Sequence, residues 1–368
     1  MVEPPQELAG LVPFAVEPRE VPLIWGGDAL VRRLGKPGDP GAAIGESWEC
    51  WDENAARGGP YAGLTIGALR ARFGHGFVGA LDPELPFPIL TKFIDARQAL
   101  SVQVHPDDAY ARRVERQANG KTECWVVLDA QPDARLILGW ARDIDRDEYI
   151  RRVEDGTLGD VLRRIPVNAG DVFYLPAGTV HAIGAGVVLF EAQQASDLTY
   201  RIFDWNRVGP DGHGRLLHTE KAADVLDYRA GHAGALRGVA FEFAGTRRTA
   251  LVADPRFVVE RVAVDSNPAR VELDEMPLIV TAQEHAVELR AGGAAIELAP
   301  YDTALVPASL GTATLSSDGA ATSVLTIAPA RDAGAVARRL ASAGVPQARI
   351  DDYLAQFGGA TPSERSVR

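Results

Sequence analysis

Short runs of β-type residues, separated by Gly, Pro and Asp turns, recur along most of this 368-residue sequence. Most are rich in β-branched, aliphatic or aromatic residues and have the length of an ordinary strand. Their regular spacing is typical of an all-β sandwich or barrel and predicts a mainly β fold. The runs cover residues 88–95, 100–105, 123–130, 134–140, 171–176, 187–194, 198–205, 256–264, 277–282, 286–289, 294–298, 303–307 and 323–329.

Helical patterns interrupt these runs in a few places. In the helix expected at residues 106–117, Pro106 takes the first helical position and two acids follow in the first turn. In the helix expected at residues 219–226, Thr219 is the expected N-cap. Two further helices are expected after residue 330, followed by a disordered end, GGATPSERSVR. The four internal helical patterns cover residues 65–73, 106–117, 145–162 and 219–226.

A weak internal repeat suggests that the chain contains two similar β-rolls. Residues 170–182 align with residues 301–313, as a turn, a strand, a proline and a second strand, with His181 matched by Thr312. The second copy therefore lacks the polar residue that would give the first its chemistry. The alternative is that two unrelated strand–turn–strand units look alike.

The repeat predicts a division into three parts. Residues 1–235 would form a metal-binding catalytic domain with helical insertions, residues 236–330 a degenerate second β domain, and residues 331–368 C-terminal helices with a flexible tail. The boundary between the rolls is expected in the Gly- and Ala-rich residues 230–238.

Composition excludes several classes of protein. The net charge of −12 argues against a nucleic-acid-binding surface or an anionic membrane, and no apolar run approaches the roughly 20 residues of a membrane span. The acidic, proline-containing start of the chain differs from a signal peptide, and two cysteines are too few for a disulfide scaffold. A cytoplasmic protein is expected, with no nucleic-acid or membrane partner.

Lysine is rare in this chain: four of the 38 basic residues are lysines and the rest are arginines. Lys92 and Lys121 fall in the most strongly patterned stretches. Either can be a compact, titratable ammonium retained for chemistry or an ordinary surface residue.

Five polar residues could form one site. In the stretch SVQVHPDD, Gln103 and His105 share one face of a strand while the two valines face a core. Glu123 opens the next strand with Lys121 two residues before it, and His181 follows a tight Pro-Ala-Gly turn. Two imidazoles, a carboxylate and an amide oxygen suit Zn²⁺ or another divalent transition metal. A hydrogen-bonded core histidine is the alternative for each imidazole.

The spacing Gly170-x5-Pro176-x-Gly178-x2-His181 resembles the second motif of the cupin superfamily of small jelly-roll barrels. Ala185 stands where that motif usually has Asn, which is not a ligand. The resemblance implies two cupin-type jelly rolls with short helical insertions and a helical tail.

A closer resemblance covers about residues 45–226. The runs FPILTKFIDARQALSVQVHPDDAYA, GKTECWVVLDA, GDVFYLPAGTVHAIGAGVVLFEAQQASDLTYRIFDWNR and LHTEKAADVL are similar, in this order, to the type I phosphomannose isomerases (mannose-6-phosphate isomerases). The resemblance implies one Zn²⁺ per chain, bound by Gln103, His105, Glu123 and His181. It also implies interconversion of mannose 6-phosphate and fructose 6-phosphate through a cis-enediolate.

The resemblance implies catalytic roles for Arg201, Lys121 and Lys92. Arg201 matches the active-site arginine of the family and is suited to stabilising an enediolate oxygen. Lys121 is favoured as the base, because a divalent ion nearby would lower its pKa. Lys92 is a second candidate for the base or a contact to the phosphate.

The phosphate must be bound by side chains, because the sequence has no Walker or Rossmann glycine motif. Ser101, Lys92 and Arg201 are the candidates, and Asp197 could orient Arg201 or contact the substrate. His218 is a weaker candidate for a supporting role beside the pocket. The expected partner is a phosphosugar, and the protein would be a monomer or small homo-oligomer.

Three other functions fit parts of the pattern. A metal-dependent cupin oxygenase would use two His and one carboxylate and leave positions open for oxygen. A non-catalytic phosphosugar-binding cupin could keep the roll and the metal without needing Lys121 and Arg201 together. An isomerase of another phosphosugar also fits, since no residue identifies the sugar's configuration.

Overall fold

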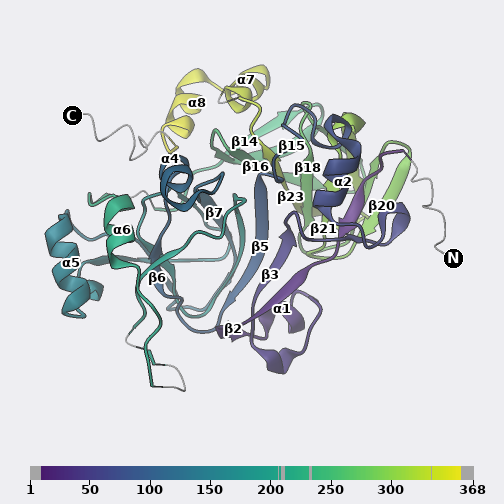
Figure 1. The fold of residues 1–368 in the computed structure, drawn as a ribbon. Coiled ribbons are helices and arrows are strands. Elements are labelled where there is room, and N and C mark those ends of the chain that lie inside the picture. Colours follow the sequence, from purple (N-terminus) through teal and green to yellow (C-terminus); the bar gives the residue numbers. More distant parts are fainter. Residues whose placement is uncertain (1–9, 206, 209–211, 232–233, 333, 358–368) are drawn as a thin grey trace. The chain divides into compact units, whose positions relative to one another are not determined.

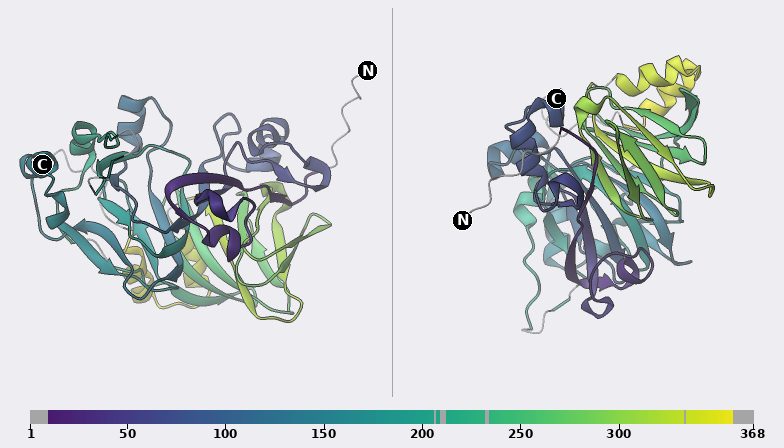
Figure 2. Two further views of the ribbon diagram at one scale, coloured as in Figure 1. Left: turned by 90° about the horizontal axis from the view of Figure 1, so that it is seen from below. Right: turned by 90° about the vertical axis from the view of Figure 1, so that its right-hand side faces the viewer.

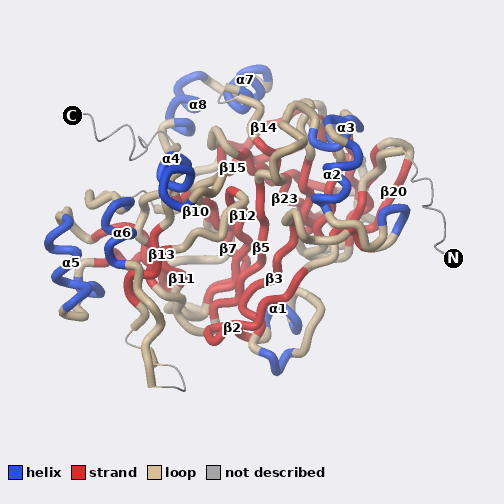
Figure 3. Tube along the Cα trace, in the orientation of Figure 1, coloured by secondary structure: helices blue, strands red, loops and turns tan. Residues whose placement is uncertain are grey.

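The computed structural model describes residues 10–205, 207–208, 212–231, 234–332 and 334–357, and its strands far outweigh its helices (Figure 3). The chain forms two compact units. We call the unit of residues 20–47, 90–237 and 355–368 the first roll, and the unit of residues 1–19, 48–89 and 238–354 the second roll. The predicted disordered end, residues 358–368, lies outside the described residues.

The first roll is built from two antiparallel sheets (Figure 1). The larger sheet has the order β10 (Val172–Leu175), β7 (Glu123–Ala130), β12 (Val187–Gln194), β5 (Ile89–Ala96), β3 (Ile44–Cys50) and β2 (Arg19–Gly27). The smaller has the order β13 (Tyr200–Phe203), β6 (Val102–Val104), β11 (His181–Ile183), β8 (Arg135–Trp140) and β9 (Leu162–Pro166).

Alternating side chains divide the apolar residues of the smaller sheet between two cores. Leu136 and Leu138 join Trp125 and Phe173 of the larger sheet in the interior between the sheets. Ile137, on the opposite face of β8, belongs to a second cluster beneath the helices α5 (Arg146–Glu154) and α6 (Thr219–Val225). Residues of the smaller sheet that point inward therefore face the larger sheet.

The remaining helices of the first roll are short. They are α1 (Ala29–Arg32), α4 (Asp108–Tyr110) with a π-helical turn at Ala111–Glu115, and 3₁₀ turns at Pro40–Ala42 and Leu158–Asp160. Two predicted starts are wrong in detail. The helix predicted from Pro106 begins at Asp108, because the Asp107 side chain accepts a hydrogen bond from the Tyr110 amide as N-cap. Thr219 is the first residue of α6, not its cap, since the chain turns helical one residue earlier than predicted.

The second roll repeats the two-sheet construction, and Figure 2 (right) shows its green strands in layers with the yellow tail helices at one end. The larger sheet has the order β14 (Val239–Phe243), β15 (Thr246–Ala253), β16 (Phe257–Val264), β23 (Thr322–Pro329), β18 (Leu278–Ala282), β21 (Thr303–Val306), β1 (Phe14–Val16) and β4 (Ala56–Arg57). The smaller has the order β17 (Ala269–Glu272), β22 (Thr312–Ser316), β19 (Val287–Ala291) and β20 (Ala294–Leu298).

The helices of the second roll include the predicted segment at residues 65–73 and the predicted tail pair. They are α2 (Ile66–Phe73), α3 (His75–Val78), α7 (Ala335–Ser342) and α8 (Gln347–Leu354), with 3₁₀ turns at Gly59–Tyr61 and Ala308–Leu310. Thr65 caps α2 by accepting a hydrogen bond from the Ala68 amide. None of the described helices is long and apolar enough to span a membrane.

The prediction of a mainly β fold with two rolls and a helical tail is confirmed. The compact units divide the chain differently from the predicted boundaries. Residues 1–19 and 48–89 group with the second roll, because β1 pairs with β21 and β4 pairs with β1.

Candidate metal centre

The stretch SVQVHPDD delivers three polar side chains to the interior of the first roll. Val102 and Val104 are fully buried in the cluster beneath α5 and α6. Because side chains alternate along a strand, Ser101, Gln103 and His105 point to the opposite face, between the two sheets.

The two imidazoles are held in the same tautomer by the backbone. Nδ1 of His105 lies 2.8 Å from the carbonyl oxygen of Leu198, and Nδ1 of His181 lies 2.9 Å from that of Thr179. A carbonyl oxygen can only accept, so each Nδ1 carries the proton and each Nε2 keeps its lone pair. This is the tautomer in which Nε2 can bind a metal, and such backbone contacts are typical of metal-binding histidines.

Glu123 brings a carboxylate to both Nε2 atoms. It is the first residue of β7 and is fully buried, with Oε1 3.2 Å from Nε2 of His181 and Oε2 3.5 Å from Nε2 of His105. One ligand atom from each of the three residues lies within 4.8 Å of the others. Apart from the Lys121 ammonium, 2.8 Å from Oε2, both carboxylate oxygens face the two unprotonated Nε2 atoms, which cannot donate a hydrogen bond. Lone pairs that face one another at these distances fit a bound cation between them, so these residues suit a divalent metal.

Gln103 lies beside this group of three. It is directly opposite His181 in the pairing of β6 with β11, and its Nε2 lies 3.3 Å from Nε2 of His181. Rotation of the amide by 180° would present Oε1 to the same place as the imidazole nitrogen. An amide oxygen is thus within reach as a fourth donor.

Lys121 is the nearest positive charge to these donors. Its Nζ lies 2.8 Å from Oε2 of Glu123 and 3.2 Å from Nε2 of His105, and the side chain is buried. Burial lowers the pKa of Lys121, but the attraction of Glu123 outweighs it and holds the pKa above its usual range. The pKa of Lys121 is therefore not lowered by the protein groups alone.

The buried groups are in the protonation states that metal binding requires. Burial lowers the pKa of His105 to about 3, and it also lowers the pKa of His181. Burial opposes ionisation of Glu123, but Lys121 and the two imidazoles hold its pKa well below its usual range. At neutral pH the site offers two neutral imidazoles and one carboxylate.

A second group of charges lies around Lys92 on β5. Its Nζ is 3.3 Å from Oε2 of Glu46 and 3.9 Å from Oε1 of Glu191, and Glu191 accepts a 2.8 Å hydrogen bond from Nε1 of Trp125. Two effects raise the pKa of Glu191 to about 7: burial is the larger, and repulsion from Glu123 is the next largest. Lys92 is thus a buried ammonium between two carboxylates, not a surface lysine.

Sequence reasoning missed Glu46 and Glu191 as site residues. Glu191 had one usable signal: it is a charged residue inside the apolar run VVLFEAQQ, which is buried along its whole length. Unpaired charges are rarely buried, so such a residue calls for a partner of opposite charge. Glu46 had no comparable signal, because its run GESWE is short and mixed.

Arg201 lies directly opposite Gln103 in the pairing of β13 with β6. Its Nε lies 3.2 Å from the hydroxyl of Ser101 and its Nη1 lies 3.2 Å from the carbonyl oxygen of Leu216. The Arg201 amide donates to Nδ1 of His218, which therefore holds the backbone of β13. The structure thus brings Arg201 and Ser101 to the strand that carries Gln103.

Asp197 is exposed, and none of the hydrogen bonds described for Arg201 reaches it. Asp204, the other carboxylate near Arg201 in the sequence, instead pairs with Arg207 and Arg215. The proposed orientation of Arg201 by Asp197 is therefore not among the described contacts.

Comparison with known proteins places the chain in a family, although no family model matches it. The chain is 39% identical over 218 residues to a probable mannose-6-phosphate isomerase of Bacillus subtilis, covering 58% of this chain and 68% of that protein. It is 38% identical over 240 residues to a mannose-6-phosphate isomerase of Streptococcus mutans, covering 64% and 74%.

The fold matches solved structures over a longer range. The crystal structure of the mannose 6-phosphate isomerase of Bacillus subtilis superposes with a TM-score of 0.77 at 30% identity, covering 86% of this chain and 99% of that one. A structure of a zinc-bound mannose 6-phosphate isomerase matches with a TM-score of 0.68 at 14% identity over 86% and 99%, and this likeness concerns the fold alone. The fold and the buried His–Glu–His group define a cupin-type protein with a candidate metal site. The chain belongs to the mannose-6-phosphate isomerase family, which confirms the resemblance seen in the sequence.

Proposed function

We propose that this protein is a zinc-dependent aldose–ketose isomerase that interconverts mannose 6-phosphate and fructose 6-phosphate. The observation that carries the proposal is the convergence of two Nε2 lone pairs and the Glu123 carboxylate beside the Lys121 ammonium. Family membership supports the reaction class and the substrate.

The metal would be held by His105, Glu123 and His181, with Gln103 as the fourth ligand, one ion per chain. Two imidazoles with two oxygen donors form a borderline set that suits Zn²⁺ better than Mg²⁺ or Ca²⁺. When bound, the ion would polarise the two oxygens of the substrate and offset the negative charge that raises the pKa of Lys121.

The reaction moves a proton between C2 and C1 of the sugar, and Lys121 is the proposed base. Its Nζ is beside the metal ligands, and its buried position keeps competing water away from the proton. Lys92 is the alternative base, and its Nζ lies 3.3 Å from Glu46 and 3.9 Å from Glu191.

Arg201 and Ser101 are proposed to bind the anionic parts of the substrate. The Arg201 guanidinium is always charged and lies beside the strand that carries Gln103, so it can stabilise an enediolate oxygen or grip the phosphate. Ser101 positions Arg201 and can donate its own hydroxyl. Lys92 remains a proposed phosphate contact and Asp197 a proposed substrate contact.

We further propose that the protein works in the cytoplasm. Cys50 and Cys124 are both buried, and no disulfide bond joins them. Such cysteine use is typical of a reducing compartment. The oligomeric state, a monomer or small homo-oligomer, stays a prediction.

The reaction is tested by following mannose 6-phosphate and fructose 6-phosphate with purified protein, before and after chelation and with zinc restored. We expect activity that disappears on chelation and returns with zinc. A folded, zinc-loaded protein without turnover would overturn the proposal and leave the binding-protein alternative, and oxygen uptake with Fe(II) would favour the oxygenase.

The base is tested by Lys121→Met and Lys92→Met. If Lys121 is the base, its loss lowers kcat by about 10²- to 10⁴-fold while bound zinc stays at one per chain. Loss of Lys92 would then act mainly on KM. The reverse pattern would make Lys92 the base.

A further inference from the structure

Arg201, the proposed substrate-binding arginine, lies on an edge strand. β13 is the outermost strand of the smaller sheet of the first roll, with β6 as its neighbour. In an antiparallel pair, the amide and carbonyl of one residue bind the partner strand and those of the next residue point away from it. The amide and the carbonyl of Arg201 both bind His218, which comes from the segment before α6. The position of Arg201 therefore depends on contacts outside the sheet.

His218 covers this edge with one backbone contact and one side-chain contact. Its amide donates to the Arg201 carbonyl oxygen at 2.8 Å, and its Nδ1 accepts from the Arg201 amide at 3.1 Å. A neighbouring strand would bind both groups with its backbone, whereas here an imidazole nitrogen supplies the acceptor. Two residues earlier, the carbonyl oxygen of Leu216 accepts from Nη1 of Arg201 at 3.2 Å. Residues 216–218 thus hold both the backbone and the guanidinium of Arg201.

The contact with the Arg201 amide fixes the protonation state of His218. An amide N–H can only donate, so Nδ1 of His218 keeps its lone pair and Nε2 carries the proton. This tautomer is the reverse of that of His105 and His181, whose Nδ1 atoms carry the proton. An imidazolium has a proton on both nitrogens and would bring an N–H against the N–H of Arg201. Protonation of His218 therefore breaks one of its two contacts with the backbone of Arg201.

The groups around His218 favour the neutral imidazole. Burial lowers the pKa of His218, Arg201 and then Lys221 lower it further, and Glu115 opposes them. Glu115 also accepts hydrogen bonds from the Tyr200 hydroxyl at 2.6 Å and from Nζ of Lys221 at 2.8 Å. The ring of Tyr200 lies 6.0 Å from that of His218. Of these neighbours, which come from β13, α6 and the turn that ends at Glu115, only Glu115 favours the imidazolium.

We propose, on the basis of the substrate-binding role proposed above for Arg201, that His218 is a positioning residue that holds Arg201 only as a neutral imidazole, so that its protonation weakens the binding of the anionic substrate. Protonation leaves the His218 amide bound to the Arg201 carbonyl and removes the acceptor for the Arg201 amide. β13 then stays paired with β6 while Arg201 shifts. Charge-assisted hydrogen bonds from a guanidinium depend on its orientation, so a small shift weakens its contacts to a phosphate or an enediolate oxygen.

The side-chain contact is tested with His218→Asn and His218→Gln. Asn carries Oδ1 where His carries Nδ1, so it can accept from the Arg201 amide, and it cannot be protonated in this pH range. Gln places its amide one methylene farther from the backbone and is the matched control. At neutral pH we expect kcat/KM to fall about 5- to 10-fold in His218→Gln, the size of one lost hydrogen bond, and His218→Asn to restore it to within about 2-fold of the wild type.

The pH profile separates this role from a purely structural one. The substrate phosphate and the metal ligands titrate alike in every variant, so the ratio of kcat/KM between His218→Asn and the wild type isolates His218. We expect this ratio to rise about 5- to 10-fold as the pH falls from neutral through the pKa of His218, which NMR titration of the imidazole measures. His285→Asn removes an exposed histidine of the second roll and should give a flat ratio. A flat ratio for His218→Asn, or wild-type substrate affinity that rises as His218 is protonated, would overturn the proposal.

Hydrogen exchange of the Arg201 amide tests the same contact without turnover. In the wild type, protection of this amide, corrected for the pH dependence of free amides, should fall about 5- to 10-fold as His218 is protonated. In His218→Asn it should stay constant over the same range. A protein that shows this fall but does not turn over mannose 6-phosphate would refute the proposed function and leave the positioning of Arg201 by His218 in place. Constant protection in the wild type would refute the positioning, whatever the activity and whether or not the variants fold.

Discussion

The candidate metal centre depends on backbone contacts that hold each donor in place. The carbonyl oxygens of Leu198 and Thr179 hold His105 and His181 with Nε2 facing Glu123. No side-chain substitution can remove these contacts directly. The centre is therefore best tested at Glu123, whose carboxylate reaches both imidazoles.

Replacing Glu123 by Gln should lower zinc affinity by more than about 100-fold, because the only carboxylate among the three donors becomes a neutral amide. The measurement is a zinc titration against a competing chelator. Glu154→Gln is the matched control, since Glu154 is an exposed residue of the same roll and should leave affinity unchanged. Equal affinities of the two variants would show that zinc binds elsewhere.

Stability of the chelated protein should fall as the pH drops from 6.5 toward about 3. In this range an unfolded chain takes up protons on its histidines, whereas buried His105, with its pKa of about 3, does not. Each imidazole that stays neutral in the folded protein lowers the free energy of unfolding by about 1.4 kcal/mol for every unit by which the pH falls. The lowered pKa of His181 acts in the same direction. Urea unfolding at several pH values measures the slope, and a His105→Gln variant should show a shallower one. A stability independent of pH between 6.5 and 4.5 would contradict this account.

At the scale of elements, a close contact between two turns positions Lys121 and Glu123. A Cβ on Gly120 would lie 2.4 Å from the carbonyl carbon of Asp107 and 2.5 Å from the carbonyl oxygen of Pro106. The Lys121 amide donates to the same Pro106 oxygen at 3.0 Å. The turn after β6 and the turn before β7 are therefore packed backbone against backbone.

Gly120→Ala should separate these turns. We expect a loss of about 1–3 kcal/mol in unfolding free energy and at least about 10-fold in zinc affinity, because Glu123 moves relative to His105. Gly159→Ala is the control, since its Cβ would meet nothing closer than 3.7 Å. Denaturant unfolding and zinc titration check both values. A Gly120→Ala protein that binds zinc normally would show that the turn contact does not position the ligands.

Element boundaries were predicted well where local chemistry decides them. Thr65 caps α2 as a residue of its type should, and Asp145 caps α5 by accepting from the Glu148 amide. The start at Pro106 was wrong because Asp107, the next residue, is the better capping group. Pairing of β1 with β21 could not be predicted, because it joins segments almost 300 residues apart and leaves no local pattern.

At the scale of the whole molecule, the two rolls should respond differently to zinc. At a zinc concentration of about 100 times Kd, binding stabilises the folded site by about 2.7 kcal/mol. Amide hydrogens that exchange only when the site opens should then exchange about 100-fold more slowly. We expect this slowing in β6, β7 and β11 and less than about 3-fold in the second-roll strands β17, β18 and β22, whose inward-pointing residues Val271, Leu278 and Ala313 cannot bind zinc. Hydrogen exchange with and without chelator measures it, and equal protection of the equivalent strands would contradict the assignment.

Local pattern alone determined much of this protein. Alternation in SVQVHPDD put Gln103 and His105 on one face, and the turn before His181 with the strand start at Glu123 made these two residues candidates for the other donors, while the family resemblance implied the full ligand set. These inferences hold because side-chain direction in a strand follows from the backbone repeat of two residues. The internal sequence repeat of residues 170–182 and 301–313 separately matched His181 with Thr312 and so predicted a second roll without that histidine.

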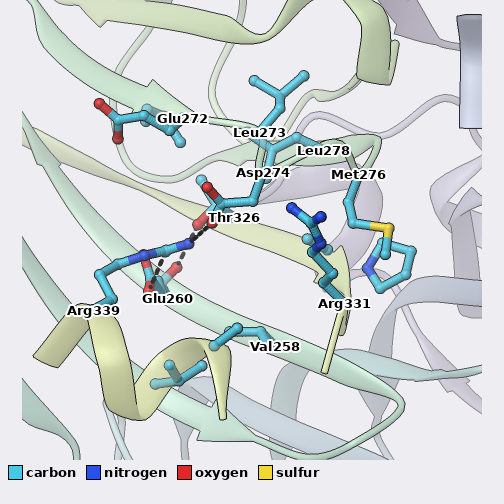
Figure 4. A pocket seen from close by; sticks show the side chains of 15 residues that line it. Val258, Glu260, Glu272, Leu273, Asp274, Met276, Leu278, Thr326, Arg331 and Arg339 are labelled. Carbon is cyan, nitrogen blue, oxygen red and sulfur yellow. Dashed lines mark hydrogen bonds and ion pairs between the residues drawn. The ribbon is translucent and has the colours of Figure 1, made fainter. Parts of the chain in front are cut away.

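Tertiary structure alone decided which charges meet. Glu46 and Glu191 reach Lys92 from separate strands, and Arg339 reaches Glu260 from a helix 79 residues further along the chain (Figure 4). A charged residue in a sequence shows only that it will need a partner of opposite charge if its side chain becomes buried. Its partner is set by the order and register of the sheets, because the energy of an ion pair depends on distance and burial and not on separation along the chain.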